Sequence, residues 1–339
     1  MRKYLLIEKK ENISSFLLKN SLYFVSNKKI YSNVNNNFVN INSNNIYSVE
    51  NLILSDTEKV YDFNLENYQI FINDDFQYRR RYYKNIVTFN NETNIFFYDI
   101  AKNQLVRKMN LNSFTIYGTI YCFINEYAII LGKDTTISAF DYIQEKILWQ
   151  YNLETYFHQP AQIMEGRVLV SNNKIIFFAH TEDWSNYATF VLDAQTGEVL
   201  FTTQEMGMKL ITYNDFVYQI QRKAIKILDP KNLKIETIDV STYCDEQSIF
   251  LDDHTVFFYK DKLYTLAREQ GSDVYNIWVI FNLKTQQFEH REDMFINPKK
   301  KKDEKNKMFI NDIQANDNLV AIRCSDKLYI FEKQDIESK

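Results

Sequence analysis

Histidine is the side chain best suited to acid–base catalysis and metal binding near neutral pH, and the chain has four: His158, His180, His254 and His290. They lie in unrelated segments, without the H-E-x-x-H, H-x-E or paired-histidine spacing that directs two ligands to one metal ion. The stretch "LDDH" that ends at His254 has ligand chemistry, but between two apolar segments it is predicted to be a polar turn. No metal site is expected.

Nucleophiles and phosphate-binding loops have no better support in the sequence. There is no G-x-S-x-G motif, and the six glycines are scattered, so neither G-x-G-x-x-G nor a P-loop can be drawn. Cys122, Cys244 and Cys324 form no C-x-x-C pair or disulfide framework, which favours a reducing, cytoplasmic location. We expect no catalytic residue and no cofactor.

The densest cationic and aromatic stretch is "FQYRRRYYKN", residues 76–84 with the following Asn. Its candidate partner-binding residues are Tyr78, Arg79, Arg80, Arg81 and Tyr82. They could stack on bases and meet phosphates, or insert into an acidic protein partner. They could equally form a strand with Tyr toward the core and Arg outside. The net charge of −4 gives no general reason to expect nucleic acid or an anionic membrane as a partner.

Two longer loops, "ETYFHQPAQIMEG" and "HTEDWSNY", carry further contact candidates: Tyr156, Phe157, His158 and Trp184. Aromatic side chains on loops of a rigid scaffold are typical anchors of protein–protein interfaces. These residues, with those of the 76–84 stretch, therefore predict a protein partner.

The elements that must position these loops are strands. Tyr (24) and Phe (26) are abundant while Gly (6) and Pro (3) are rare, which favours pleated sheets over helices. In "TFVLDAQTGEVLF", Thr189 to Phe201, two alternating segments flank a Thr-Gly turn and predict a hairpin. The same pattern of strand, Asp or Asn, turn and strand recurs along the chain. Its anchor residues are Asn33, Asn64, Asp99, Asp141, Asp193, Asp229, Asn282 and Glu332.

Successive anchors lie between 31 residues (Asn33 to Asn64) and 53 residues (Asp229 to Asn282) apart. This spacing matches four-stranded blades with variable loops, so we predict an all-β fold with a single β-propeller domain over residues 1–339. The count favours eight blades, and merging the first two would give seven. The N-terminal "RKYLLIE" is predicted to supply the missing strand of the last blade and to close the ring. Residues 292–308 are predicted to form a mobile charged loop.

The segment "FVLDAQTGEVLF", and more loosely "SAFDYIQEKILWQ", resembles the repeat of the PQQ-like (quinoprotein-type) β-propellers. Trp149 and Phe201 each stand eight residues after their Asp, where that family carries an aromatic residue that docks neighbouring blades. Arg107, Thr237 and His290 take this place elsewhere. The resemblance implies a propeller, and a diverged one, because most turns lack Thr-Gly.

A propeller with long aromatic loops and no catalytic pattern predicts a non-catalytic protein-binding module. A small propeller of this type is similar to the immunity proteins that bacteria pair with toxins, which implies a toxin or effector as the partner. The alternatives are a quinoprotein-like enzyme that uses the central funnel, and polyanion binding through residues 76–84. The sequence lacks the adjacent Cys pair of quinoprotein dehydrogenases. The apolar run within the first 15 residues is too short for an export signal or a membrane helix.

Overall fold

Short antiparallel strands joined by tight turns make up almost all of the protein, as its aromatic-rich, glycine-poor composition predicts. The structure is a computed structural model. It describes residues 3–27, 29–32, 38–40, 46–49, 52–55, 60–62, 67–68, 82–90, 93–99, 101–102, 104–110, 112, 118–164, 168–296 and 307–334.

Within these residues the strands form eight sheets, numbered here along the chain. Sheet 1 consists of β2 (Ile13–Leu18), β3 (Leu22–Ser26), β4 (Lys29–Ser32) and β5 (Phe38–Asn40). Sheet 2 consists of β6 (Ile46–Val49), β7 (Leu52–Ser55), β8 (Val60–Asp62) and β9 (Asn67–Tyr68). Sheet 3 consists of β10 (Tyr82–Tyr83), β11 (Ile86–Asn90), β12 (Asn94–Asp99) and β13 (Gln104–Asn110). Sheet 4 consists of β14 (Thr119–Phe123), β15 (Ala128–Lys133), β16 (Thr136–Asp141) and β17 (Lys146–Asn152).

Sheet 5 has five strands: β18 (Ala161–Ile163), β19 (Leu169–Ser171), β20 (Lys174–Thr181), β21 (Tyr187–Asp193) and β22 (Val199–Thr203). Sheet 6 consists of β23 (Ile211–Tyr213), β24 (Phe216–Gln221), β25 (Ala224–Asp229) and β26 (Lys234–Asp239). Sheet 7 consists of β27 (Ile249–Tyr259), β28 (Lys262–Glu269), β29 (Ile277–Asn282) and β30 (Gln287–Asp293). Sheet 8 combines β31 (Ile310–Ala315), β32 (Leu319–Cys324) and β33 (Lys327–Gln334) with β1 (Lys3–Lys10).

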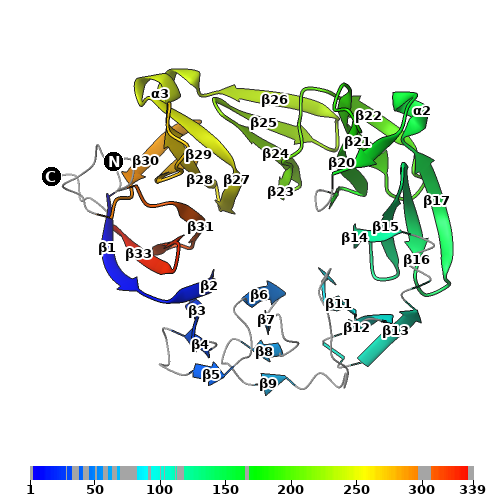
Figure 1. Ribbon diagram of the computed structural model, residues 1–339, viewed down its shortest axis with the longest axis horizontal. Helices are drawn as coiled ribbons and strands as arrows, with labels where there is room; N and C mark the ends of the chain where they lie inside the picture. Colours follow the sequence, from blue (N-terminus) through cyan, green and yellow to red (C-terminus); the bar gives the residue numbers. More distant parts are fainter. Residues whose placement is uncertain are drawn as a thin grey trace.

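The sheets are arranged around a common centre, with their first strands innermost (Figure 1). Within each sheet, strands that follow one another along the chain pair antiparallel, except that β18 and β19 both pair with β20 and that β1 pairs with β33. This arrangement confirms an all-β propeller. The hydrophobic core lies between neighbouring sheets: Trp149, Phe177 and Phe190 pack between sheets 4 and 5, and Trp278 lies in the cluster between sheets 7 and 8.

The N-terminal strand β1 pairs with β33, from Lys3 opposite Gln334 to Lys10 opposite Leu328 (Figure 1). The register of this pair contains a one-residue bulge. The outermost strands of sheets 3, 4, 5 and 7 contain a bulge at the equivalent place. The inserted residue lies between the partners of the first and the second residue before the anchor. The inserted residues are Ile7, Val106, Leu148, Leu200 and Glu289. Because β1 shares this feature, it is structurally an outer strand, although it comes from the other end of the chain.

The anchor residues have the turn chemistry that the repeat predicts. The Asp193 carboxylate accepts hydrogen bonds from the backbone N–H groups of Gln195 (2.8 Å) and Thr196 (2.9 Å), and Gly197 follows at φ 73°. The carboxylate or amide oxygens of Asp99, Asp141, Asp229 and Asn282 accept from their turns in the same way. Asn33 and Asn64 lie outside the described residues, and Glu332 continues in β33 opposite Leu319.

In each sheet from 3 to 7, one residue of the outer strand lies opposite the second residue before the anchor, and in sheets 3 to 6 this residue contacts the anchored turn of the next sheet. We call this the docking position. Trp149 occupies it in sheet 4 and packs on Gly197 of sheet 5. Its equivalents are Arg107, which forms an ion pair with Glu145; Phe201, which packs in one cluster with Leu233; and Glu236, whose carboxylate accepts a hydrogen bond from Gln286 Nε2 (3.2 Å).

Two sequence-based expectations need correction. The docking position of sheet 6 is taken by Glu236 and not by Thr237, because β26 lacks the bulge and its register is therefore displaced by one residue. The "LDDH" stretch lies within β27 and does not separate two strands, although the register is interrupted between Leu251, opposite Ala267, and Val256, opposite Thr265. Thr265 Oγ1 donates to the Asp252 carbonyl (3.1 Å), which holds the two strands together there. A polar segment can remain in a strand when its neighbour supplies the hydrogen bonds.

Candidate functional site

The longer connections gather at one end of the propeller. The segments that follow the outer strands of sheets 4 and 6 carry α2 (Glu154–Phe157) and α3 (Ser241–Glu246). Backbone hydrogen bonds from Leu153 N to Thr135 O (2.8 Å) and from Val240 N to Lys223 O (3.0 Å) tie them to the turns between second and third strands. We call the end that carries α2, α3 and these turns the helix end. The anchored turns lie at the opposite end.

The predicted contact residues 156–158 occur in and after α2, but they do not share one role. Tyr156 is 38% exposed, and its ring packs edge-on against Phe190 at 5.0 Å. Phe157 is only 8% exposed and belongs to the core between sheets 4 and 5. His158 is exposed in a left-handed conformation (φ 57°), and its N–H donates to Glu154 O (2.9 Å). Tyr156 and His158 are therefore available to a partner, whereas Phe157 anchors α2 in the core.

Trp184 lies in the turn between β20 and β21 at the helix end. Its ring stacks on His180, with 3.5 Å between centroids and 14° between planes. His180 is buried, whereas Trp184 remains 48% exposed at φ 59°. Tyr187, which the sequence did not single out, is 40% exposed beside it and contacts Phe178 at 5.8 Å. Trp184 and Tyr187 together form what we call the Trp184 surface.

The turn that presents Trp184 is fixed by one carboxylate. Asp183 Oδ1 accepts hydrogen bonds from Thr181 Oγ1 (2.6 Å), Ser185 N (3.0 Å) and Ser185 Oγ (2.8 Å). These bonds, that of Thr181 first, lower the pKa of Asp183 to about 2, so the carboxylate stays ionised and keeps its partners near neutral pH. An exposed tryptophan on a turn fixed in this way is held in one orientation.

The structure does not bring Tyr156 and Trp184 into contact. Tyr156 packs on Phe190, on the side of sheet 5 that faces sheet 4. Trp184 packs on the opposite side, over His180 and Phe178, because adjacent residues of a strand point to opposite faces. Tyr78, Arg79, Arg80 and Arg81 lie outside the described residues, and of Tyr82 only its backbone place in β10 is described.

Sequence reasoning also missed a cluster of cationic side chains at the helix end. The Phe250 ring has Arg222 Cζ, Lys223 Nζ and Arg268 Cζ at 5.6, 5.5 and 5.6 Å from its centroid. The cations come from two different sheets, so no sequence window contains them together. Lys223 forms an ion pair with Asp245 (2.5 Å), whereas Arg222 is exposed.

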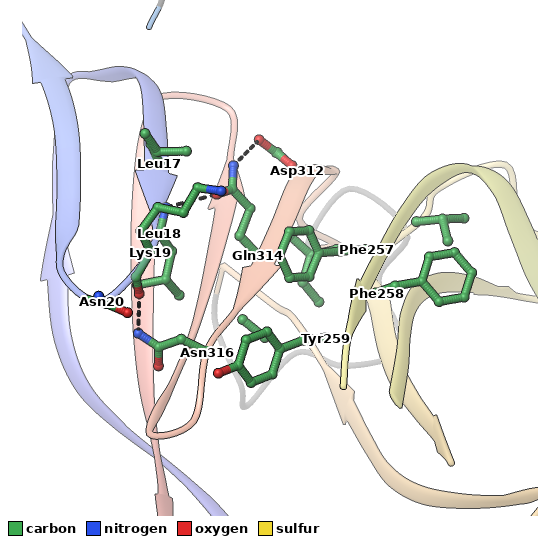
Figure 2. Close-up of a pocket in the computed structure, with 13 residues that line it drawn as sticks. Leu17, Leu18, Lys19, Asn20, Phe257, Phe258, Tyr259, Asp312, Gln314 and Asn316 are labelled. Carbon is green, nitrogen blue, oxygen red and sulfur yellow. Dashed lines mark hydrogen bonds between the residues drawn. The ribbon is translucent and has the colours of Figure 1, made fainter. Parts of the chain in front are cut away.

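A pocket of about 490 Å³ lies between the innermost strands of sheets 7, 8 and 1 (Figure 2). One wall is aromatic and belongs to β27; Phe257 and Tyr259 are its rings nearest sheet 8. The facing wall comes from β2 and the chain after it, with Leu17, Leu18 and Lys19. Between them, β31 contributes Gln314, which the close-up shows in the middle of the pocket, and Asp312, which it shows at the upper end.

Gln314 joins two of these walls. Its Oε1 accepts a hydrogen bond from Leu18 N (2.8 Å), and its Nε2 donates to Phe16 O (3.2 Å), so it replaces a neighbouring strand along the free edge of β2. Asn316 Nδ2 similarly donates to Lys19 O (2.7 Å). The sides of the pocket that come from β31 and β2 are thereby joined to each other without a ligand.

Asp312 is the charged group of the pocket that is most withdrawn from water. Burial raises the pKa of its carboxyl group, an effect that the nearby Arg323 charge and the Gln314 amide only partly oppose. Gln314 Nε2 lies 3.5 Å from Asp312 Oδ2. Arg323 is opposite Asp312 in the register of β31 and β32, but its Nη1 donates to the Ser325 carbonyl (3.2 Å).

The described part of the chain also bears on metal, thiol and membrane chemistry. There, no three His, Cys, Asp or Glu side chains gather as metal ligands. The three cysteines are free thiols, and burial raises the pKa of Cys244 to about 11 and that of Cys324 to about 12. Among the same residues, no helix has the length and apolar character needed to cross a membrane.

No protein-family model matches this sequence, and no curated protein is similar to it. Several solved structures are similar in fold. BamB from Moraxella catarrhalis is 10% identical, with a TM-score of 0.54 over 97% of this chain and 100% of that one. The Dos1 propeller is 9% identical, with a TM-score of 0.56 over 97% and 95% of the two chains. Sqt1 from Saccharomyces cerevisiae is 8% identical, with a TM-score of 0.55 over 97% of each. At such identities the likeness shows the fold alone, and this fold is a β-propeller.

Proposed function

We propose that this chain is a non-catalytic β-propeller that binds another protein through its helix end. The observation that carries the proposal is the Trp184 surface. Trp184 is half exposed to solvent, yet its ring stacks on His180 and its turn is held by hydrogen bonds to Asp183. An exposed aromatic residue that is already ordered loses little conformational entropy on binding, and such residues dominate the energy of protein interfaces.

More specifically, we propose that the partner is a toxin or effector and that this chain is its immunity protein. Such a protein acts by covering the partner's active surface, which requires a rigid platform and no chemistry of its own. It would act in the cytoplasm of the cell that makes it. The support is the type of molecule, a propeller with aromatic loops at one end, together with the absence of any catalytic pattern in the sequence.

We further propose that the eight sheets are the blades of one ring closed by β1, and that their repeat is a diverged PQQ-like repeat. The bulge that β1 shares with other outer strands supports closure. The packing of Trp149 on Gly197 supports the relationship, because the PQQ-like repeat carries an aromatic residue at this place.

The experiment is co-expression with each protein encoded beside this gene, scored by growth and, for any that is toxic, by calorimetric affinity. We expect one toxic neighbour to be neutralised, and Trp184→Ala to weaken its binding at least tenfold. The matched control is Tyr127→Ala. Tyr127 is 51% exposed, and it lies in the turn before β15, at the end of this strand that is remote from the helix end.

Binding that is unchanged by Trp184→Ala and by Tyr187→Ala would overturn the placement of the interface. If no neighbouring protein is toxic or bound, the immunity role is wrong. Dye-linked oxidation by the protein with added quinone and calcium would overturn its non-catalytic character.

A further inference from the structure

The pocket between β2, β27 and β31 is separate from the Trp184 surface. It lies among innermost strands, whereas Trp184 lies in the turn between β20 and β21 (Figure 1). At about 490 Å³, it has room for a ligand the size of an amino-acid side chain with several atoms to spare. Gln314 and Asn316 already join β31 to β2, so a ligand would not have to bring these two sides of the pocket together.

The carboxyl group of Asp312 is the strongest polar feature of this pocket. Within the described residues, no cation lies within ion-pair distance of it, and its one side-chain hydrogen-bond partner is the Gln314 amide at 3.5 Å. Arg323 faces the same side of sheet 8 but donates to Ser325 O instead. A carboxylate withdrawn from water, with no cation at ion-pair distance, is a site where a cationic ligand gains most, because the surrounding dielectric is low.

The aromatic wall suits the same ligand. Phe257 is packed on Tyr264 at 6.4 Å, while its ring borders the pocket opposite Gln314 (Figure 2). The Tyr259 ring already has Lys260 Nζ at 5.5 Å, so Phe257 is the better placed face for a further cation or for the alkyl chain that carries it. Lys19, the other charge on the lining, is exposed and therefore screened by water.

We propose that this pocket binds an alkylguanidinium or alkylammonium group, with the charge at Asp312 and the alkyl chain against Phe257. The group has two sources, a free small amine or guanidine and an Arg or Lys side chain inserted by a protein. Both offer the same chemistry to the pocket.

The probes are butylguanidine, its neutral isostere butylurea, and a nine-residue Gly-Ser peptide with one central Arg, each titrated calorimetrically into the full chain. Butylguanidine is expected to bind saturably and butylurea at least tenfold more weakly, because only the charge differs. A peptide that binds tenfold tighter than butylguanidine identifies a protein side chain as the source; equal or weaker binding identifies a small molecule.

The variants separate charge from shape. Asp312→Asn is expected to weaken butylguanidine about thirtyfold, and Phe257→Leu about fivefold. Lys19→Met should strengthen it about threefold, because a like charge is removed from the lining. Because Lys19 is exposed, Lys19→Met should fold normally and still tests the role of charge if Asp312→Asn folds poorly. The matched control is Asp215→Asn, which removes a carboxylate from a second cavity of about 450 Å³ and should leave the affinity unchanged.

Three results would overturn the proposal: equal binding of butylurea and butylguanidine, weaker binding of the cation by Lys19→Met, or affinities of every probe poorer than about 10 mM. None of these results bears on the Trp184 surface, so the two proposals fail separately.

Discussion

Trp149 of sheet 4 covers Gly197 of sheet 5. The indole Nε1 donates to the Ala194 carbonyl (2.9 Å), and a Cβ added to Gly197 would lie 2.5 Å from ring atoms of Trp149. Gly197 also adopts φ 73°, a conformation that side chains other than glycine disfavour. The turn and the tryptophan therefore need glycine for two independent reasons, and together they fix the angle between two sheets.

Gly197→Ala should lower the free energy of unfolding by about 3 kcal/mol, because it adds a left-handed alanine and displaces the Trp149 ring. Gly271→Ala is the matched control. Gly271 has φ 88°, but a Cβ there would meet nothing within 4 Å, so only the conformational cost of about 1 kcal/mol is expected. Urea denaturation of both variants measures the difference, and equal losses would show that the contact with Trp149 is unimportant.

The contact between sheets 3 and 4 should accept the same pair of residues as Trp149 and Gly197, with Trp in place of Arg107 and Gly in place of Glu145. There Arg107 and Glu145 form a part-exposed ion pair that contributes less than about 1 kcal/mol, and Glu145 has φ 53°. In a double-mutant cycle of Arg107→Trp and Glu145→Gly, we expect a favourable coupling of about 1 kcal/mol, because the ring needs the space that Gly provides. Strictly additive effects on unfolding by urea would mean that the two sheet contacts are not equivalent.

His290 makes the contact between sheets 7 and 8 sensitive to acid. It occupies the docking position, with Tyr4 of β1 at 4.7 Å and Trp278 at 4.3 Å between ring centroids, and burial lowers its pKa to about 4. The unfolded chain, with an ordinary pKa near 6.5, binds a proton first, so stability falls as the pH is lowered from about 6.5 to about 4.

His290→Phe should remove about 2 kcal/mol of this loss, measured as the difference in unfolding free energy between pH 7 and pH 4.5. The value allows for the partial exposure of the ring. His158→Asn, at an exposed position with φ 57°, is the control that should keep the pH dependence of the natural chain. A pH dependence that survives in His290→Phe would assign it to other groups.

The cysteines should differ in reactivity. Burial raises the pKa of Cys244 to about 11 and of Cys324 to about 12, so at pH 8 about one thiol in a thousand or fewer is ionised at these positions. Cys122 is only half-buried. A thiol-specific chromogenic reagent should therefore label one cysteine in the native protein and three in urea, and rapid native labelling of Cys122→Ser would contradict this.

Much of each sheet could be predicted because its chemistry is local. Asp193 and its turn lie within four residues, and the alternation of "TFVLD" with "GEVLF" needs only a strand's period of two. The docking position shows where such reasoning ends. Counting eight residues from the anchor finds Trp149 and Phe201 but gives Thr237 instead of Glu236, because one strand lacks a bulge that no residue type announces.

The candidate sites were predicted less well, and for the same reason. Trp184 could be named from its loop, but its support by His180 depends on the path of the β20–β21 hairpin. Phe157 belongs to the same kind of loop and is buried, because α2 turns it toward Phe190.

The anchored turns of sheets 3 to 7 and the pairing of the N-terminal segment with the last strand could be predicted from the residues alone, since each follows from short-range hydrogen bonding or from an edge that must be covered. Long-range packing sets which loops stand exposed, and it places Leu17, Phe257 and Asp312 around one pocket. Leu17 precedes Phe257 by 240 residues in the sequence, and these residues meet because β31 of sheet 8 contacts both β27 of sheet 7 and β2 of sheet 1.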